Sequence, residues 1–427
     1  MKIVSYKQSA YKARLNKLLN RFELSEVPVE KTVRSILKDI KKNGDAAVLK
    51  YTKKFDHLNL NKKDFGISRK EIKKAYQMAD PKVVESLKFA ADRIFSFHQR
   101  QKTESWSYQE GNVTLGQLVQ PMDRAGLYVP GGKAAYPSSL LMNAIPALVA
   151  GVPSLAVCVP ALNGEINPCI LVAADILGIK EIYPIGGAQA IGAMAFGTRT
   201  IKRVDKIVGP GNIFVATAKR LVYGWVDIDM IAGPSEVLVI ADESANPAYV
   251  ASDLLAQAEH DEKAYPICIT PSMALAREIK KEMELKLKTM ARKKIAGESM
   301  RNNGIIFVTE SLDKAIEIAN LLAPEHLELE VKNPEVYIKK IKHAGALFLG
   351  HFTPEAVGDY LAGPNHVLPT GGTARFFSPL CVDDFIKKTS IISYSREALA
   401  RVSDHVIRLA NAEGLTGHAH SMEIRRK

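Results

Sequence analysis

The run Gln257-Ala258-Glu259-His260-Asp261 is the first group of residues with side chains suited to chemistry, and it ends an apolar, helix-like stretch. Gln257 and His260 are three positions apart, so they share one face of a helix. An amide oxygen and an imidazole nitrogen are both ligands of divalent metals such as zinc. A polar last turn of a helix often has the same composition, so the spacing alone leaves metal binding and a plain helix end both open.

A second group is Pro324-Glu325-His326-Leu327, which stands between an expected helix and an expected strand. An adjacent Glu and His can activate water and accept a proton. Neighbouring side chains of a strand point to opposite faces, so both can serve one site only where the chain turns, and Pro324 favours such a turn. The alternative is the polar start of an ordinary strand.

A third group occupies residues 353–366, where Asp359 and His366 are candidate ligands or polar contacts. Glycines and prolines shape this loop, whereas a plain surface loop would more often carry Lys and Glu. The polar C-terminal tail adds Glu413 and His418, although a disordered chain end would look similar.

Three glycine-containing loops, 128–132, 186–189 and 209–212, each follow an expected strand. Turns after parallel strands lie at the carboxyl edge of a sheet, where ligands bind. None of the three matches G-x-G-x-x-G, because Phe214 stands where the third glycine would follow Gly209 and Gly211. Nucleotide binding and ordinary tight turns therefore both stay open. Ser235, in a further loop before a strand, can bond a ligand or cap a turn.

The elements that must position these residues follow an α/β pattern. From Gly126 onward short apolar runs alternate with helix-like segments, which predicts parallel sheets. There are too many such runs for one compact sheet, so we expect two α/β units. The expected strands are 125–130, 155–160, 181–187, 205–209, 236–242, 265–270, 304–308, 326–331 and 345–350.

The first 105 residues read as mostly helical. Apolar residues at helical spacing predict a helix that ends at Gly44. Ser68 and Glu71 have the spacing of a capping box and predict the start of a helix to about residue 102, broken near Pro81. After residue 378 we expect one strand over 387–395 and a helix over 395–411.

Composition places the chain among ordinary globular proteins. It has 427 residues, of which 47% are hydrophobic and 24% charged, which excludes collagen-like, coiled-coil and disordered classes. No apolar run reaches the roughly 18 residues of a membrane helix, and the first residues lack the apolar segment of a secretory signal.

Four scattered cysteines form no CxxC motif and stand beside no activating His, so we expect neither a Cys-type zinc finger nor a catalytic thiolate. A reducing cytoplasm is the simplest location.

The net charge of +12 comes from the N-terminal part of the chain. Residues 1–105 contain 25 Lys+Arg against 12 Asp+Glu, whereas the remainder contains 33 against 34. A solvated helical face explains this excess, and a weak attraction for anionic ligands or nucleic acid is the alternative. No motif of a nucleic-acid-binding family supports that alternative.

Taken together, these segments resemble histidinol dehydrogenase from about Phe97 to the C-terminus. The most specific stretches are 228–236 followed by 256–260, then 324–327, 353–369 and 413–418, all in the order of that family. The resemblance implies that the chain oxidises L-histidinol twice with NAD⁺, through L-histidinaldehyde to L-histidine, in the last steps of histidine biosynthesis. It also implies one zinc ion per site.

The resemblance assigns roles to individual positions. The implied zinc ligands are Gln257, His260, Asp359 and His418, with the amino and imidazole nitrogens of the substrate completing the coordination sphere. His326 would take the alcohol proton as hydride leaves, and Glu325 would activate the water that hydrates the aldehyde. The implied NAD contacts are Tyr128, Gln189 and Asn212. The implied substrate contacts are Ser235, Gln257, His260, His326, Asp359, His366, Glu413 and His418.

The resemblance also implies an intertwined homodimer of α/β subunits with two incomplete Rossmann-like domains. The expected bounds are 1–23 for an N-terminal helical segment, 24–124 with 234–380 for an interrupted first domain, 125–233 for the second domain, and 381–427 for a tail domain. The tail would reach the site of the partner, so Glu413 and His418 would act across the dimer. No nucleic acid and no membrane is expected as a partner.

Three alternatives stay open at this point. The same scaffold could oxidise another small polar alcohol, such as a sulfonated diol, although no Arg or Lys stands next to His366 to bind a sulfonate. A metal-dependent hydrolase could use Glu325 to activate water without NAD⁺. A nucleic-acid-binding protein could use the basic N-terminal segment, and its binding would depend on salt.

Overall fold

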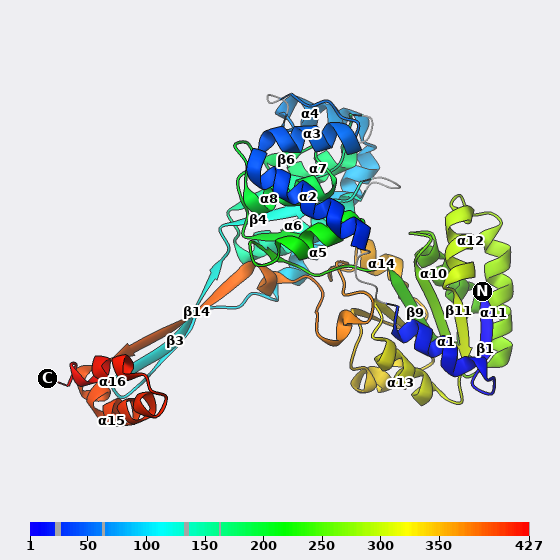
Figure 1. Ribbon diagram of the computed structural model, residues 1–427. Coiled ribbons are helices and arrows are strands. Elements are labelled where there is room, and N and C mark those ends of the chain that lie inside the picture. Colours follow the sequence, from blue (N-terminus) through cyan, green and yellow to red (C-terminus); the bar gives the residue numbers. More distant parts are fainter. Residues whose placement is uncertain (22–26, 62–64, 132–135, 162–163, 427) are drawn as a thin grey trace.

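Two parallel β-sheets organise the chain into two α/β lobes, and a narrow arm projects away from them (Figure 1). The computed structural model describes residues 1–21, 27–61, 65–131, 136–161 and 164–426. We name the two lobes by their six-stranded and five-stranded sheets. The structure therefore confirms the expected α/β class and the two parallel sheets.

The six-stranded lobe has the strand order β1-β11-β10-β9-β12-β13, and every neighbouring pair is parallel. Alternate residues of its central strand β9 point to opposite faces, so Val237 and Val239 enter one core while Leu238 and Ile240 enter the other. Helices α10, α11 and α12 cover the first face, and α1 and α13 cover the second. Its strands are β1 (Lys2–Ser5), β9 (Glu236–Ala241), β10 (Tyr265–Thr270), β11 (Ile305–Val308), β12 (His326–Glu330) and β13 (Ala346–Leu349). Its helices are α1 (Ala10–Leu19), α10 (Pro247–Ala258), α11 (Met273–Leu287), α12 (Lys293–Asn302), α13 (Leu312–Leu322), the 3₁₀ segment η1 (Pro334–Lys340) and the short α14 (Glu355–Tyr360).

The five-stranded lobe has the strand order β6-β5-β4-β7-β8, again with parallel pairs only. The chain runs from β4 outward through β5 and β6, then returns to the other side of β4 for β7 and β8. The order thus reverses at β4, and such a switch point is where open parallel sheets bind ligands. Its strands are β4 (Arg124–Tyr128), β5 (Ser154–Cys158), β6 (Glu181–Tyr183), β7 (Lys206–Val208) and β8 (Asp227–Ile228). Its helices are α2 (Val27–Asn43), α3 (Asp45–Phe55), α4 (Arg69–Met78), α5 (Pro81–Gln99), α6 (Pro137–Ala150), α7 (Pro168–Ile176), α8 (Gly187–Phe196) and α9 (Ile213–Val222).

The N-terminal helices begin and end largely where the sequence predicts. Ser68 and Glu71 form the expected capping box at the start of α4, and Asp80 caps α5 directly before Pro81. The side chains of α2 to α5 enter the cores of the five-stranded lobe. The expected first domain joins residues 24–124 with 234–380. In the structure, the apolar faces of these helices instead cover the five-stranded sheet, which residues 124–228 form. The N-terminal segment also differs from the expected helical segment 1–23, because it begins with β1, an edge strand of the six-stranded sheet.

The arm consists of an antiparallel sheet that carries two terminal helices (Figure 1). Its strands are β2 (Trp106–Glu110), β3 (Val113–Pro121) and β14 (Ile386–Tyr394), and its helices are α15 (Arg396–Ala412) and α16 (Thr416–Glu423). Two 3₁₀ segments precede β14 in the chain: η2 (Thr373–Arg375) contacts the end of α13, and η3 (Val382–Phe385) packs into the core of the five-stranded lobe. The sequence predicts β14 and α15 but not β2 and β3.

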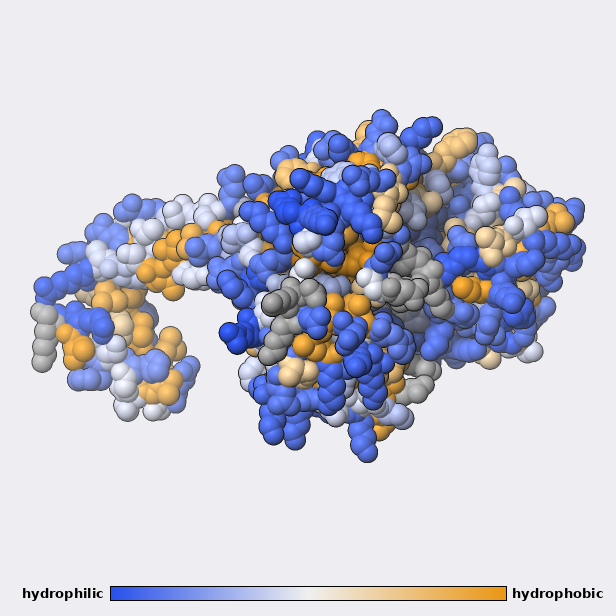
Figure 2. All heavy atoms as spheres, turned by 90° about the horizontal axis from the view of Figure 1, so that it is seen from above, coloured by the Kyte–Doolittle hydropathy of each residue, from blue (hydrophilic) through white to orange (hydrophobic). Residues whose placement is uncertain are grey.

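Apolar side chains of the arm are exposed in the single chain. Ile392 is 70% exposed, and Leu409 of α15 is 65% exposed. Figure 2 shows hydrophobic residues gathered along this arm. Within the described residues, none of the helices combines the length and the apolar composition that crossing a bilayer requires.

Candidate active site

The predicted acid/base pair lies where α13 passes into β12. Ala323 ends α13 in the left-handed conformation with φ +46°, and Pro324 then turns the chain so that His326 begins β12. Glu325 accepts the backbone N–H of Glu236 with an Oε2–N distance of 2.8 Å. His326 donates from Nδ1 to the carbonyl oxygen of Glu236 at 2.9 Å. One backbone position therefore holds both side chains, and the turn that the sequence requires is present.

A buried ion pair fixes the Glu236 residue that holds this pair. Its carboxylate receives two hydrogen bonds from the Arg21 guanidinium, the second with an Nη2–Oε2 distance of 2.7 Å. It also accepts the backbone N–H of Gly371 at 2.9 Å. Arg21 is 215 residues away in the sequence, so no local pattern predicts this contact.

Gln257 and His260 meet at the end of α10, as their spacing predicts. The atoms Nε2 of Gln257 and Nδ1 of His260 are 3.2 Å apart, and the Gln257 side chain is fully buried. In the amide orientation that satisfies its neighbours, Gln257 accepts from His260 and donates to Glu355 at 3.0 Å. The amide thereby connects α10 to α14.

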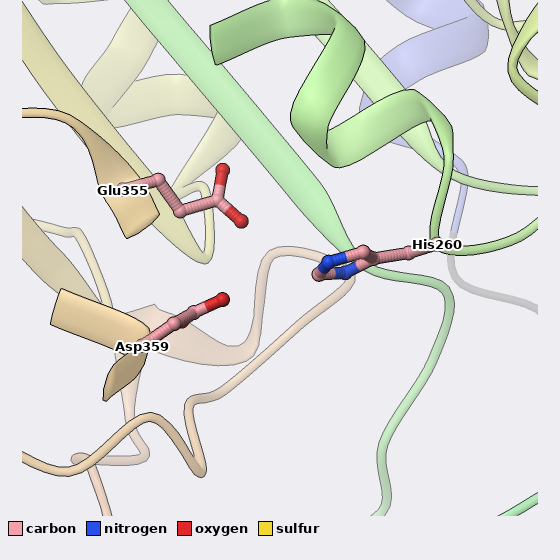
Figure 3. Close-up of side chains that lie close together, drawn as sticks. All are labelled: His260, Glu355 and Asp359. Atoms are coloured by element: carbon pink, nitrogen blue, oxygen red, sulfur yellow. The ribbon is translucent and has the colours of Figure 1, made fainter. Parts of the chain in front are cut away.

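The short helix α14 contributes two carboxylates to the same place. Glu355 and Asp359 are four residues apart and point toward His260 (Figure 3). Single ligand atoms of His260, Glu355 and Asp359 lie within 4.8 Å of one another. One imidazole nitrogen with two carboxylate oxygens is a donor set that Zn²⁺ accepts, so these residues fit a zinc ion. Glu355 was not among the predicted site residues, although its i, i+4 spacing to Asp359 is the signal that would have identified it.

The packing beneath α14 explains how this helix is held. The backbone N–H of Glu355 donates to Oε1 of Glu328 at 2.7 Å. A Cβ atom on Gly358 would lie 2.6 Å from the Phe348 ring, so only glycine lets α14 approach β13 this closely. Side chain and backbone contacts together fix the position of the two α14 carboxylates.

Burial and carboxylate charge dominate the electrostatics of the site. Burial raises the pKa of Glu325 to about 8 and that of Glu355 to about 8. For His326, burial lowers the pKa, but the carboxylates of Glu355, Glu325 and Asp359 outweigh this effect and raise it well above the ordinary value. Such an excess of buried negative charge is the environment that a divalent cation neutralises.

The hydrogen bond at Nδ1 also sets the chemistry of the His326 ring. Because Nδ1–H donates to a carbonyl oxygen, the neutral ring has its lone pair on Nε2. Nε2 is buried, lies 3.7 Å from Oδ1 of Asp359, and has no hydrogen-bond partner among the described residues. The carboxylates around His326 favour its protonated form, so Nε2 can accept a proton from a ligand bound beside Asp359 once a cation neutralises these carboxylates and the ring is neutral.

His366 connects the two lobes next to this cluster. Its Nδ1 donates to the backbone oxygen of Asp359 at 2.9 Å, and its Nε2 lies 3.3 Å from Oγ of Ser139. Burial lowers the pKa of His366 and favours the neutral ring. Ser139 belongs to the first turn of α6, so the start of this helix approaches the zinc candidates. Ser235 is half-buried and directly precedes Glu236.

The three predicted nucleotide contacts share the carboxyl edge of the five-stranded sheet. The Tyr128 hydroxyl, at the end of β4, accepts the N–H of Gly187 at 3.0 Å. Gln189 is buried in the first turn of α8 and donates to Asp56 at 3.1 Å. Asn212 caps α9 by accepting the N–H of Phe214 at 3.0 Å. These positions surround the switch point at β4, and their contact with NAD stays a prediction.

Only a glycine fits at position 209 on this edge of the sheet, because any Cβ atom would collide with the backbone of β4. Its φ is +118°, and a Cβ atom would lie 2.0 Å from the backbone oxygen of Tyr128. The loop after β7 therefore passes directly over the end of β4. Gly132, at the end of the first glycine loop, lies outside the described residues.

Comparison with known proteins identifies the family. The family model described as histidinol dehydrogenase matches residues 19–426. The chain belongs to the histidinol dehydrogenase family. A histidinol dehydrogenase of Syntrophotalea carbinolica is 52% identical over 100% of this chain and 99% of that protein, and one of Bacillus cereus is 51% identical over 97% and 96%. The crystal structure of histidinol dehydrogenase from Elizabethkingia anophelis has a TM-score of 0.93 at 38% identity and covers 100% of this chain and 98% of that one.

In this member of the histidinol dehydrogenase family, a single chain brings together only part of the predicted site. Gln257, His260 and Asp359 converge, whereas His418 is exposed on α16 at the far end of the arm (Figure 1). Glu413 ends α15 in the same region and is also exposed. The roles of both tail residues stay predictions.

Proposed function

We propose that the protein is a zinc- and NAD-dependent histidinol dehydrogenase that oxidises L-histidinol to L-histidine through L-histidinaldehyde. The observation that carries this proposal is the convergence of His260, Glu355 and Asp359 next to Glu325 and His326 in a chain of this family. The donors suit zinc, and the adjacent pair suits proton transfer. The relatives described above are each named histidinol dehydrogenase, which agrees with the proposed activity.

Gln257, His260 and Asp359 would hold the zinc ion together with His418 of the partner subunit. Bound zinc would supply a Lewis-acidic anchor for the amino and imidazole nitrogens of histidinol, which orients the alcohol carbon. Glu355 adds a further carboxylate beside the three ligands of this chain. His366 and Ser235 line the neighbouring space and would contact the substrate, as would Glu413 of the partner subunit.

His326 and Glu325 would move the protons of the two oxidations. In the first, Nε2 of His326 takes the hydroxyl proton while the carbon gives a hydride to NAD⁺, which forms the aldehyde and NADH. Glu325 then takes a proton from the water that adds to the aldehyde, while protonated His326 returns its proton to the aldehyde oxygen, which gives the neutral hydrate and makes His326 neutral again. In the second oxidation His326 takes a hydroxyl proton of the hydrate, and a second hydride leaves to a second NAD⁺. The hydrogen bonds to Glu236 keep both side chains in position through these steps.

We further propose that the protein works as an intertwined homodimer. The exposed apolar side chains of the arm, including Ile392 and Leu409, support a partner covering this surface. Dimerisation would also explain why Glu413 and His418 are exposed at the end of the arm. A cytoplasmic location accords with the four free cysteines, none of which is in a disulfide within the described residues.

Product analysis tests the proposed substrate. Purified zinc-loaded protein is incubated with L-histidinol and NAD⁺, and the products are separated by chromatography. We expect L-histidine as the end product, and no conversion of a sulfonated diol under the same conditions. Oxidation of the diol but not of histidinol would contradict the substrate assignment, and turnover of a substrate by hydrolysis without NAD⁺ would contradict the oxidoreductase assignment.

A further inference from the structure

Asp56 reaches the nucleotide edge of the five-stranded lobe from the N-terminal helical layer. It ends α3, and its backbone N–H donates to the carbonyl oxygen of Thr52 at 2.9 Å. Its side chain points to the start of α8, where Oδ2 accepts the backbone N–H of Gly186 at 3.2 Å and the Gln189 amide at 3.1 Å. The carboxylate thus fixes the amide of a residue that we expect to contact NAD.

The turn that Asp56 holds is tightly packed. The Tyr128 hydroxyl accepts the N–H of Gly187, the residue after Gly186. A Cβ atom on Gly186 would lie 2.6 Å from the Pro160 ring and 3.2 Å from Oδ1 of Asp56. The donors and acceptors at the start of α8 therefore have fixed positions, and the carboxylate belongs to this fixed group.

The second oxygen of the Asp56 carboxylate is available to a ligand. The hydrogen bonds from Gly186 and Gln189 both end on Oδ2, and Oδ1 accepts none from the described residues. A carboxylate has about four lone-pair sites, so further acceptor capacity remains. The side chain is half-buried rather than enclosed, which leaves it within reach of a bound molecule.

The charge of Asp56 is uncompensated by any Lys or Arg of the described residues at ion-pair distance. Burial raises its pKa, while the hydrogen bonds from Gly186 and Gln189 and the neighbouring His57 act in the opposite direction. In dinucleotide-binding folds an acidic side chain at the carboxyl edge of the sheet accepts the 2′-hydroxyl of the adenosine ribose, and Arg nearby is needed where that position carries a phosphate.

We propose that Asp56 is a cofactor-positioning residue that also selects NAD over NADP. One oxygen holds the Gly186 N–H and the Gln189 amide in place, and the other accepts a ribose hydroxyl. The same carboxylate disfavours a 2′-phosphate by charge repulsion. This inference rests on the NAD part of the proposed function.

Cofactor binding to the zinc-loaded protein without histidinol tests this role. NADH and NADPH are titrated against wild type, Asp56→Asn, Asp56→Ala and the control Asp92→Ala, and nucleotide fluorescence reports binding. Asp92 is an exposed acid of α5 in the same helical layer. For Asp56→Ala we expect the NADH dissociation constant to rise about tenfold, equivalent to about 1.4 kcal/mol. For Asp56→Asn, which removes the charge at nearly constant shape, we expect the preference for NADH over NADPH to fall at least about fivefold.

Kinetics and folding separate this role from a purely structural one. In the Asp56 variants the KM for NAD⁺ should rise while kcat and the KM for histidinol change little, and the melting temperature of Asp56→Asn should match that of Asp92→Ala. The inference would be overturned if both Asp56 variants fold and bind NADH as tightly as wild type, with the same preference for NADH over NADPH. Wild-type protein that binds neither nucleotide would instead contradict the NAD assignment itself.

Discussion

Removal of the Arg21 side chain should destabilise the six-stranded lobe strongly. Arg21 and Glu236 have side chains that are only 2% and 1% exposed, so solvent cannot replace the lost partner. Arg21 also donates to the carbonyl oxygens of Leu18 and Leu322, which ties α1 and the end of α13 to β9. The substitution Arg21→Met keeps much of the side-chain volume but leaves the Glu236 carboxylate buried and unpaired.

Breaking one partner of a buried ion pair costs about 3–5 kcal/mol. At about 2–4 °C per kcal/mol for a lobe of this size, Arg21→Met should lower the melting temperature by roughly 10 °C. The double variant Arg21→Met with Glu236→Gln should recover at least half of this loss, because no unpaired charge remains and Gln can still accept from Gly371. Because Glu236 holds Glu325 and His326, kcat of the single variant should fall as well.

Calorimetry of the zinc-loaded protein measures these shifts. The control is Arg34→Met, which removes an exposed i, i+4 pair with Glu30 and should cost less than about 0.5 kcal/mol. A melting temperature for Arg21→Met equal to that of Arg34→Met would refute the reasoning. Failure of the double variant to recover any stability would show that packing, rather than the unpaired charge, causes the loss.

Three further predictions concern the site and its surroundings. Glu325→Gln and His326→Asn should each lower kcat at least about a hundredfold without loss of bound zinc, because both side chains would transfer protons; steady-state NADH formation and metal analysis measure this. Glu355→Ala should weaken Zn²⁺ binding about tenfold or more, measured by competition with a chromogenic chelator, because its carboxylate lies beside His260. Glu330→Gln should raise the melting temperature more at pH 8 than at pH 5. Burial raises the pKa of Glu330 from 4.5 to about 8, so the stability that this group contributes is fully present below pH 4.5 and is lost as the pH rises from there through 8.

Different results would contradict each of these expectations. Loss of zinc together with activity in the Glu325 or His326 variants would indicate a structural role. Unchanged zinc affinity in Glu355→Ala would remove Glu355 from the metal environment, with exposed Glu335→Ala as the matched control. An equal effect of Glu330→Gln at both pH values would mean that the Glu330 carboxyl titrates normally.

The sequence predicts those parts of the structure that depend on local patterns. The capping box of Ser68 and Glu71 and the strands of both parallel sheets other than β1 and β8 are set by residues within one element, and the structure confirms them. The sequence does not predict β1 and β8. Pro324 likewise indicates the turn that places Glu325 and His326 against one backbone position. Short-range preferences are sufficient in each case.

The remaining features depend on contacts between distant segments. Arg21 meets Glu236 across 215 residues, and nothing near Arg21 signals a buried charge partner. The sequence also cannot show which sheet the apolar faces of α2 to α5 cover, since both sheets need helices on their faces. Asp56 was likewise unpredicted, because its partners Gly186 and Gln189 belong to another layer of the lobe.

The ratio of NADH formed to L-histidinol consumed tests the central claim most directly. It is measured with zinc-loaded protein, with protein stripped of metal by a strong chelator, and after Zn²⁺ is restored. The account predicts two NADH per histidinol, loss of turnover on chelation, and recovery with Zn²⁺. Absence of NADH formation by folded, zinc-loaded protein, or full turnover by the metal-free protein, would contradict it.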